Sequence, residues 1–295
     1  MRITFDPLRE GLGAINTASA QLQLAQIEAA TGKRIRKPSD DPAGAQQALA
    51  ERAELGAIDD YRHAADSASS RLASADSALG DMVDKLTQAL STVTGVRGSS
   101  VDPAARISAA TTLGGIRDAI RADLNTSFQG NSLFSGGKVD QPAYAMVGGA
   151  WTYQGDTNLV QIEVDRVRTV TIGFNGQSIA QGSDATDLFT SIDQLITAVT
   201  SNDDAGMATG LDALTRAFDR ANQAQGRLGA DESSIADTQI RLTARHTAVD
   251  GRRSKLEDAN MAEALTRMSQ AETAYKAALG SVSSVEKLSL LDYLQ

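Results

Sequence analysis

The chain has 295 residues, a formal net charge of −9 and no cysteine. The acidic balance argues against a nucleic-acid-binding protein, which needs a basic stripe to neutralise phosphates, and the lack of cysteine excludes disulfides, thiol nucleophiles and cysteine-based metal sites. Only 4% of the residues are aromatic although 41% are hydrophobic, which favours long helices packed side by side over a compact core rich in aromatic residues.

The first predicted helix starts near Asp6 and ends near Gly32, a residue type that suits a helix C-terminus. Apolar residues recur every seven positions at Leu8, Ile15 and Leu22, and small residues follow each of them by three. This spacing predicts a coiled-coil seam. We interpret the short basic run at 33–37 as cations that offset the helix dipole.

The segment 38–44 predicts a break and then a second helix. Its inter-helix turn consists of Pro38, Ser39, Asp40, Asp41 and Pro42. Asp41 can cap the free N–H groups of the next helix, and proline suits the first helical position. The second helix is predicted over 42–94, with an unbroken seven-residue apolar series from residue 58 to residue 93.

A third helix is predicted from Pro103 to about Phe128, and a β-rich insertion at 141–183. In the insertion, apolar and polar residues alternate, and the Gly148–Gly149 and Asn175–Gly176 pairs predict hairpin turns. Trp151, the single tryptophan, is expected to anchor a small core there.

Helices resume after residue 183. A short one is predicted around 188–199, followed by an acidic break at 202–204 and a long helical stretch to the C-terminus. The seven-residue series of this stretch changes phase near 258–260, which predicts a bend or boundary. The predicted coiled-coil or assembly seam comprises Leu8, Ile15, Leu22, Leu72, Leu79, Leu86, Leu242, Val249, Leu256, Leu265, Met268, Leu279, Val282, Leu288 and Leu291.

The expected fold is mainly α. Both termini form a long antiparallel coiled-coil rod, with a small β-rich insertion domain in the middle. We expect three domains: a terminal coiled-coil inner domain (1–36 plus 257–295), a helical rod domain (37–140 plus 184–256) and the β-rich outer insertion (141–183). The seams are compatible with an internal helical bundle, with self-assembly between subunits, or with both.

No catalytic, metal or cofactor site is predicted. The two histidines, His63 and His246, have no partners at the spacing that a metal site or a catalytic triad requires. The chain is therefore not expected to be an enzyme. No apolar stretch reaches 18 residues, so no membrane insertion is expected, and the first residues lack a secretory signal, which by itself indicates the cytoplasm.

Four segments resemble the flagellar hook-associated protein 3 family of the flagellin superfamily. They are the break at 31–44 with its Pro-Ser-Asp-Asp-Pro sequence, the Leu-Phe-Ser-Gly stretch within 131–136, the Tyr-Gln-Gly-Asp stretch at 153–156 and the end of the chain at 288–294. The four occur in the family's order with the seven-residue series between them, so the resemblance covers essentially the whole chain.

The resemblance implies a structural protein of the bacterial flagellum that links the hook, through hook-associated protein 1, to the flagellin filament. It also implies an extracellular location reached through the flagellar type III export apparatus without a cleaved signal peptide, which would replace the cytoplasmic expectation. The implied partners are hook-associated protein 1, flagellin, copies of the chain itself in a ring, and an export chaperone that holds the C-terminal helix. The alternatives are flagellin itself and, more remotely, a cytoplasmic coiled-coil adaptor.

Overall fold

The structure, a computed structural model, describes the backbone of residues 7–98 and 101–293 and the side chains of residues 9–98 and 101–284. Its helices are α1 (Pro7–Thr31), α2 (Pro42–Val96), α3 (Pro103–Leu124), α4 (Gly176–Ala180), α5 (Leu188–Ser201), α6 (Asp204–Glu257) and α7 (Met261–Tyr293). Three two-stranded antiparallel sheets lie between α3 and α4, formed by β1 (Ser127–Phe128) with β2 (Asn131–Ser132), β3 (Tyr144–Val147) with β4 (Ala150–Tyr153), and β5 (Gln161–Asp165) with β6 (Arg168–Thr171). The predicted fold class is confirmed.

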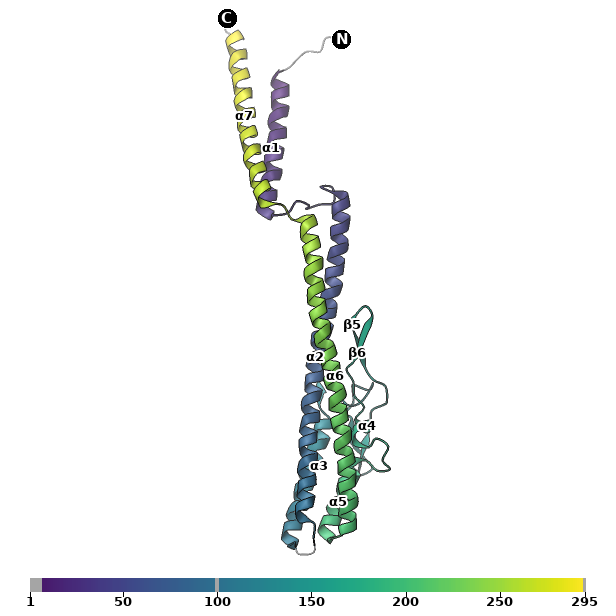
Figure 1. Cartoon of the computed structure of the whole chain (residues 1–295). Coiled ribbons are helices and arrows are strands. Elements are labelled where there is room, and N and C mark those ends of the chain that lie inside the picture. The colour runs from purple at the N-terminus through teal and green to yellow at the C-terminus, as the bar shows by residue number, and fades with distance from the viewer. Residues whose placement is uncertain (1–6, 99–100, 294–295) are drawn as a thin grey trace. The chain divides into compact units, whose positions relative to one another are not determined.

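The chain divides into two compact units. One contains Met1–Ala57 and Arg245–Gln295, and the other contains Ile58–Ala244. Because the long helices α2 and α6 each cross the division, each unit holds a part of both (Figure 1).

The core of the unit 58–244 lies along α2 and α6. Leu72, Leu79 and Leu86 of α2 are fully buried, as is Leu228 of α6. Two amides of α6 donate to carboxylates of α2, with 3.2 Å between Gln225 Nε2 and Asp76 Oδ1 and 2.7 Å between Gln239 Nε2 and Asp66 Oδ1. The seven-residue series thus packs one long helix against the other, as its spacing predicts.

The predicted end of the third helix is wrong by four residues. The helix α3 stops at Leu124 because the Asn125 side chain pairs with the backbone of Tyr144 instead of continuing the helix. The Asn125 Nδ2 atom donates to Tyr144 O at 2.9 Å, and its Oδ1 atom accepts from Tyr144 N at 2.8 Å. Phe128 then lies in β1, so a side chain that binds a distant strand decides where the helix ends.

One of the two predicted hairpin turns is confirmed. Gly148 and Gly149 join β3 to β4 with φ of 59° and 87°, which glycine adopts without strain. The predicted turn at Asn175–Gly176 is wrong. Asn175 is the N-cap of α4, its Oδ1 accepting from Gln177 N at 2.9 Å, and the β5–β6 turn lies at residues 166–167. Asparagine favours both helix caps and hairpin turns, and the surrounding chain decides between them.

Three aromatic side chains anchor the core beneath the strands. Phe134, Tyr144 and Phe189 are buried, and the Tyr144 and Phe189 rings meet edge to face with their centroids 4.9 Å apart. Trp151 packs only half-buried against this cluster, with the Arg121 guanidinium 4.0 Å above its ring. The expectation that Trp151 anchors the core is therefore corrected.

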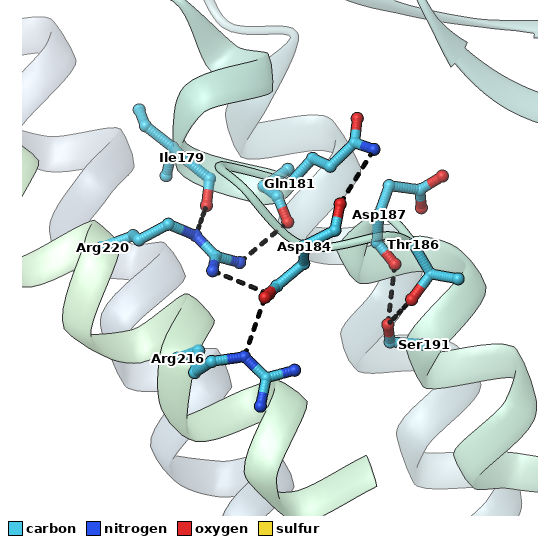
Figure 2. Close-up of polar contacts among 9 residues, drawn as sticks. Ile179, Gln181, Asp184, Thr186, Asp187, Ser191, Arg216 and Arg220 are labelled. Carbon is cyan, nitrogen blue, oxygen red and sulfur yellow. Dashed lines mark hydrogen bonds and ion pairs between the residues drawn. The ribbon is translucent and has the colours of Figure 1, made fainter. Parts of the chain in front are cut away.

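An ion-pair cluster fixes the loop between α4 and α5 to α6 (Figure 2). Asp184 accepts from Arg220 Nη1 at 2.8 Å and from Arg216 Nε at 2.9 Å, and Arg220 Nε also donates to Ile179 O at 2.9 Å. Burial raises the pKa of Asp184, but the bonds from the two arginines outweigh it and hold the pKa below its usual range. The loop is thus held by charge-assisted bonds.

Replacing Asp123 by asparagine is expected to stabilise the unit 58–244 at neutral pH. The Asp123 Oδ2 atom is buried and accepts no hydrogen bond within the described residues. Burial is the main cause that raises the pKa of Asp123 to about 6; the nearby Asp81 adds to the increase, and Lys85 opposes it. The difference from 3.8 corresponds to about 3 kcal/mol at 1.4 kcal/mol per pH unit, and partial solvation reduces this to about 1–2 kcal/mol.

The sign of this effect fixes its pH dependence. The folded state binds the Asp123 proton more tightly than the unfolded state does. The free-energy penalty for burying the charged carboxylate is therefore fully present above pH 6 and is relieved as the pH falls toward 3.8. Urea unfolding followed by Trp151 fluorescence should show a clearly larger gain in Asp123→Asn at pH 7.5 than at pH 5. The exposed Asp84→Asn serves as control, and an equal gain at both pH values would contradict the burial argument.

Candidate assembly surfaces

The terminal helices α1 and α7 pack side by side along their length (Figure 1). The contact relies on small residues, with Ala18, Ala25 and Ala264 buried in it. A Cβ atom on Gly11 would lie 2.6 Å from Val282 Cγ2, so a larger residue there would force the Val282 side chain or the helices to shift. Arg267 Nη2 and Glu28 Oε1 form an ion pair at 2.8 Å across the pair.

The structure buries the predicted seam residues to very different extents. In the long helices, Leu256 is half-buried and the other five are buried, namely Leu72, Leu79, Leu86, Leu242 and Val249. In the terminal pair, Ile15, Leu22, Met268 and Val282 are half-buried, whereas Leu265 and Leu279 are 50% and 42% exposed. The side chains of Leu8, Leu288 and Leu291 lie outside the described residues.

Further apolar side chains of the terminal pair face outward. Leu12 and Leu24 are 52% and 53% exposed, and Ile27 is 40% exposed. The seam prediction missed these three because they fall outside the seven-residue series. The signal that could have found them is a second set of apolar positions on the same helix, which widens the apolar stripe beyond what one partner helix covers. Two helices alone thus leave apolar surface on both α1 and α7.

The predicted inter-helix turn has the expected capping chemistry. The Asp40 Oδ2 atom accepts from Arg36 N and Lys37 N, both at 3.1 Å, and these bonds hold the pKa of Asp40 below its usual range. Asp41 Oδ1 accepts from Gly44 N at 3.0 Å, which caps α2. Asp41 is half-buried, and the other four turn residues are exposed, namely Pro38, Ser39, Asp40 and Pro42.

The break after α1 and the break after α6 bind each other. Ala259 N donates to Gly32 O at 2.8 Å, and Arg34 N donates to Glu257 O at 2.7 Å. The predicted boundary at 258–260 is confirmed, because α6 ends at Glu257 and α7 begins at Met261. The two breaks are separated by more than 200 residues in sequence and form one joint.

Glu257 is the centre of an ion-pair network at this joint. Its side chain is 2% exposed, and it pairs with Arg52 Nε at 2.7 Å and with Lys33 Nζ at 3.6 Å. Lys33 also donates to Asp258 Oδ1 at 2.5 Å. The hydrogen bond from Arg52 is the main reason that the pKa of Glu257 lies below its usual range despite burial. The basic run at 33–37 therefore acts structurally through Lys33.

Two arginines of α6 extend the ion-pair network by pairing with glutamates of α2. Arg245 Nη2 pairs with Glu54 Oε1 at 2.7 Å, and Arg252 Nε pairs with Glu51 Oε1 at 2.9 Å. Nothing in the sequence marks these partners, because close to 200 residues separate them. They were missed for that reason.

Glu257→Gln is expected to lower the free energy of unfolding of the unit 1–57 plus 245–295 by about 1–2 kcal/mol at pH 7, since it removes two charge-assisted contacts whose cationic ends are partly exposed. The folded-state pKa of Glu257 is lowered, so its contribution is present above the unfolded-state pKa and is lost as the pH falls through the folded-state value. Wild type and variant should therefore converge at acidic pH.

Urea unfolding followed by circular dichroism at pH 7 and at pH 3 tests this dependence. The exposed Glu263→Gln at the start of α7 is the matched control. A loss that is the same at both pH values would show that packing, and not charge, makes Glu257 important.

Within the described residues, no group of three potential ligands could hold a metal ion. Hydropathy along the described helices stays below what a bilayer span requires.

Both ends of the chain match models of known protein families. Residues 12–138 match the model of the bacterial flagellin N-terminal helical region, and residues 211–294 match that of the bacterial flagellin C-terminal helical region. Flagellar hook-associated protein 3 of Salmonella typhimurium is 28% identical over 181 residues, which cover 61% of this chain and 56% of that protein. The Escherichia coli protein of the same name is 25% identical over 172 residues, covering 58% and 54%. The chain thus spans little more than half the length of these curated relatives.

Solved structures share the fold. A flagellar hook-associated protein of Vibrio parahaemolyticus has a TM-score of 0.71 at 22% identity, covering 74% of this chain and all of that chain. Hook-associated protein 3 of Legionella pneumophila has a TM-score of 0.64 at 12% identity, covering 70% and 98%. The chain therefore belongs to the flagellin superfamily, because both of its ends match flagellin helical regions and its sequence is similar to hook-associated protein 3.

Proposed function

We propose that this chain is a structural subunit of the bacterial flagellum that joins the hook to the flagellin filament. The observation that carries the proposal is the contrast in burial between the two kinds of seam. The long helices bury five of their six predicted seam residues within the chain, whereas the terminal helices keep Leu265 and Leu279 about half exposed. A subunit that completes its apolar contacts only with neighbours has this distribution.

The names of the matched relatives support the junction over other positions in the flagellum. Both curated relatives are hook-associated protein 3. On that basis the partners are hook-associated protein 1 on the hook side, flagellin on the filament side and further copies of the chain in a ring. Export through the type III apparatus, with a chaperone on the C-terminal helix, brings the chain to an extracellular position.

The three-domain division fits this role. We assign residues 1–36 plus 257–295 to the inner domain, which neighbours cover, residues 37–140 plus 184–256 to the rod, and residues 141–183 to the outer insertion. The role is mechanical and needs neither catalysis nor a cofactor.

Deleting the gene tests the junction. Hooks should remain, filaments should be absent, and flagellin monomers should accumulate in the medium. Normal filaments and swimming in the deletion strain would contradict the proposal.

The alternative is that the chain is flagellin itself, because both matching family models describe flagellin regions. The same deletion separates the two functions. If the chain were flagellin, hooks would be present but no abundant filament protein would appear in the medium or on the cells.

A further inference from the structure

The tip of the β5–β6 hairpin presents an apolar side chain between two cations. The turn lies at residues 166–167, and the Asp165 Oδ1 atom fixes it by accepting from Arg166 N at 2.7 Å. Val167 is 94% exposed, the largest exposed fraction among the exposed large apolar residues of the described chain. Arg166 and Arg168 flank it. Such a tip has no apolar contact of its own.

A groove opens at the base of the same hairpin. It has a volume of about 580 Å³ and lies between the segment 157–179 and α6. Leu159 (49% exposed), Phe174 and Ile179 form its apolar wall on the insertion side, and Ala224 and Ala230 do so on α6.

The two charged residues that line the groove differ in their exposure to solvent. Arg227 is exposed, whereas Asp231, one turn later on α6, is half-buried, and burial raises the pKa of its carboxyl group. A cation brought to this groove would therefore gain more from Asp231 than it loses to the solvated Arg227.

We propose that the β5–β6 tip of one copy of this chain inserts into the groove of the next copy. Val167 fills the space beside Leu159 and Phe174, and the flanking arginines meet Asp231. The inference rests on the proposed function, since it requires copies to lie next to each other.

The geometry excludes the same contact within one copy. The strand Gln161–Asp165 separates the groove from the tip, and five residues at about 3.3 Å each hold the two roughly 16 Å apart. The tip and the groove are different surfaces, so their contact runs head to tail, which generates rings or helical arrays and not twofold dimers. The contact is small, so it forms only where other contacts hold the copies side by side.

Disulfide cross-linking in flagella tests the contact directly, because the chain has no cysteine of its own. The variant with both Val167→Cys and Leu159→Cys should, after oxidation of assembled flagella, give a ladder of covalent multimers of the chain. A disulfide requires Cα atoms within about 7 Å, so it reports insertion of the tip. Val167 is 94% and Leu159 49% exposed, so the fold should tolerate both changes.

Two controls make the result specific. Val167→Cys alone should give no multimers. A covalent dimer of this single variant would show that two tips meet in a twofold contact, and the head-to-tail contact would be wrong. Val147→Cys with Leu159→Cys places the cysteine beside the exposed tip of the β3–β4 hairpin, which has no flanking arginine, and should give no ladder. Absence of the ladder from the Val167→Cys, Leu159→Cys pair in assembled flagella would overturn the proposal.

Failure of this contact is distinguishable from failure of the proposed function. Before oxidation, the double cysteine variant should be incorporated and support filaments. Incorporation without cross-linking would overturn the tip contact alone, whereas absence of the chain from purified flagella in the wild-type strain would overturn both.

Discussion

Leu279→Asp is expected to leave the isolated chain folded and to abolish filament growth. Leu279 is 42% exposed on α7, so a carboxylate there stays solvated in the free chain. Once neighbouring subunits cover the helix, the same carboxylate is buried without a partner, at a cost on the order of several kcal/mol. The substitution therefore separates folding from assembly.

The measurement combines thermal unfolding of the purified chain with a count of filaments on cells that carry only the variant. Leu279→Met, which keeps an apolar side chain of similar volume, is the control and should support normal filaments. Normal filaments with Leu279→Asp would show that neighbours do not cover this face of α7, and the proposed assembly surface would be wrong.

Leu79→Ala is expected to lower the free energy of unfolding of the unit 58–244 by about 3 kcal/mol, the typical cost of a cavity at a fully buried leucine. Leu79 of α2 has no exposed surface and lies in the core cluster with Leu72, Leu86 and Met82. No neighbouring subunit is needed for this burial, so the loss should appear in the isolated chain.

Ile240→Ala is the matched control, because it truncates an aliphatic side chain of a long helix in the same unit that is 68% exposed. Its effect should stay within about 0.5 kcal/mol. Urea unfolding followed by Trp151 fluorescence and by circular dichroism measures both variants. Equal losses would mean that burial does not determine the contribution of these side chains.

The sequence by itself determined the long helices and their breaks. A seven-residue apolar series specifies a helix and its buried face through local geometry alone, which is why α2 and α6 match their predictions. The breaks were equally local, since proline, glycine and a capping carboxylate act within a few residues. The turn at 38–42 and the boundary at 258–260 follow from such residues.

Only the tertiary structure decided features that depend on partners distant in sequence. Asn125 ends α3 because Tyr144 is there to pair with its amide, and Glu257 is charged and buried because Arg52 reaches it across 205 positions. The exposure of Leu279 belongs with these features, since the same apolar spacing that buries Leu79 leaves it half covered. Periodicity fixes the direction in which a side chain points along its helix, whereas the number of neighbouring elements fixes whether anything lies there to cover it.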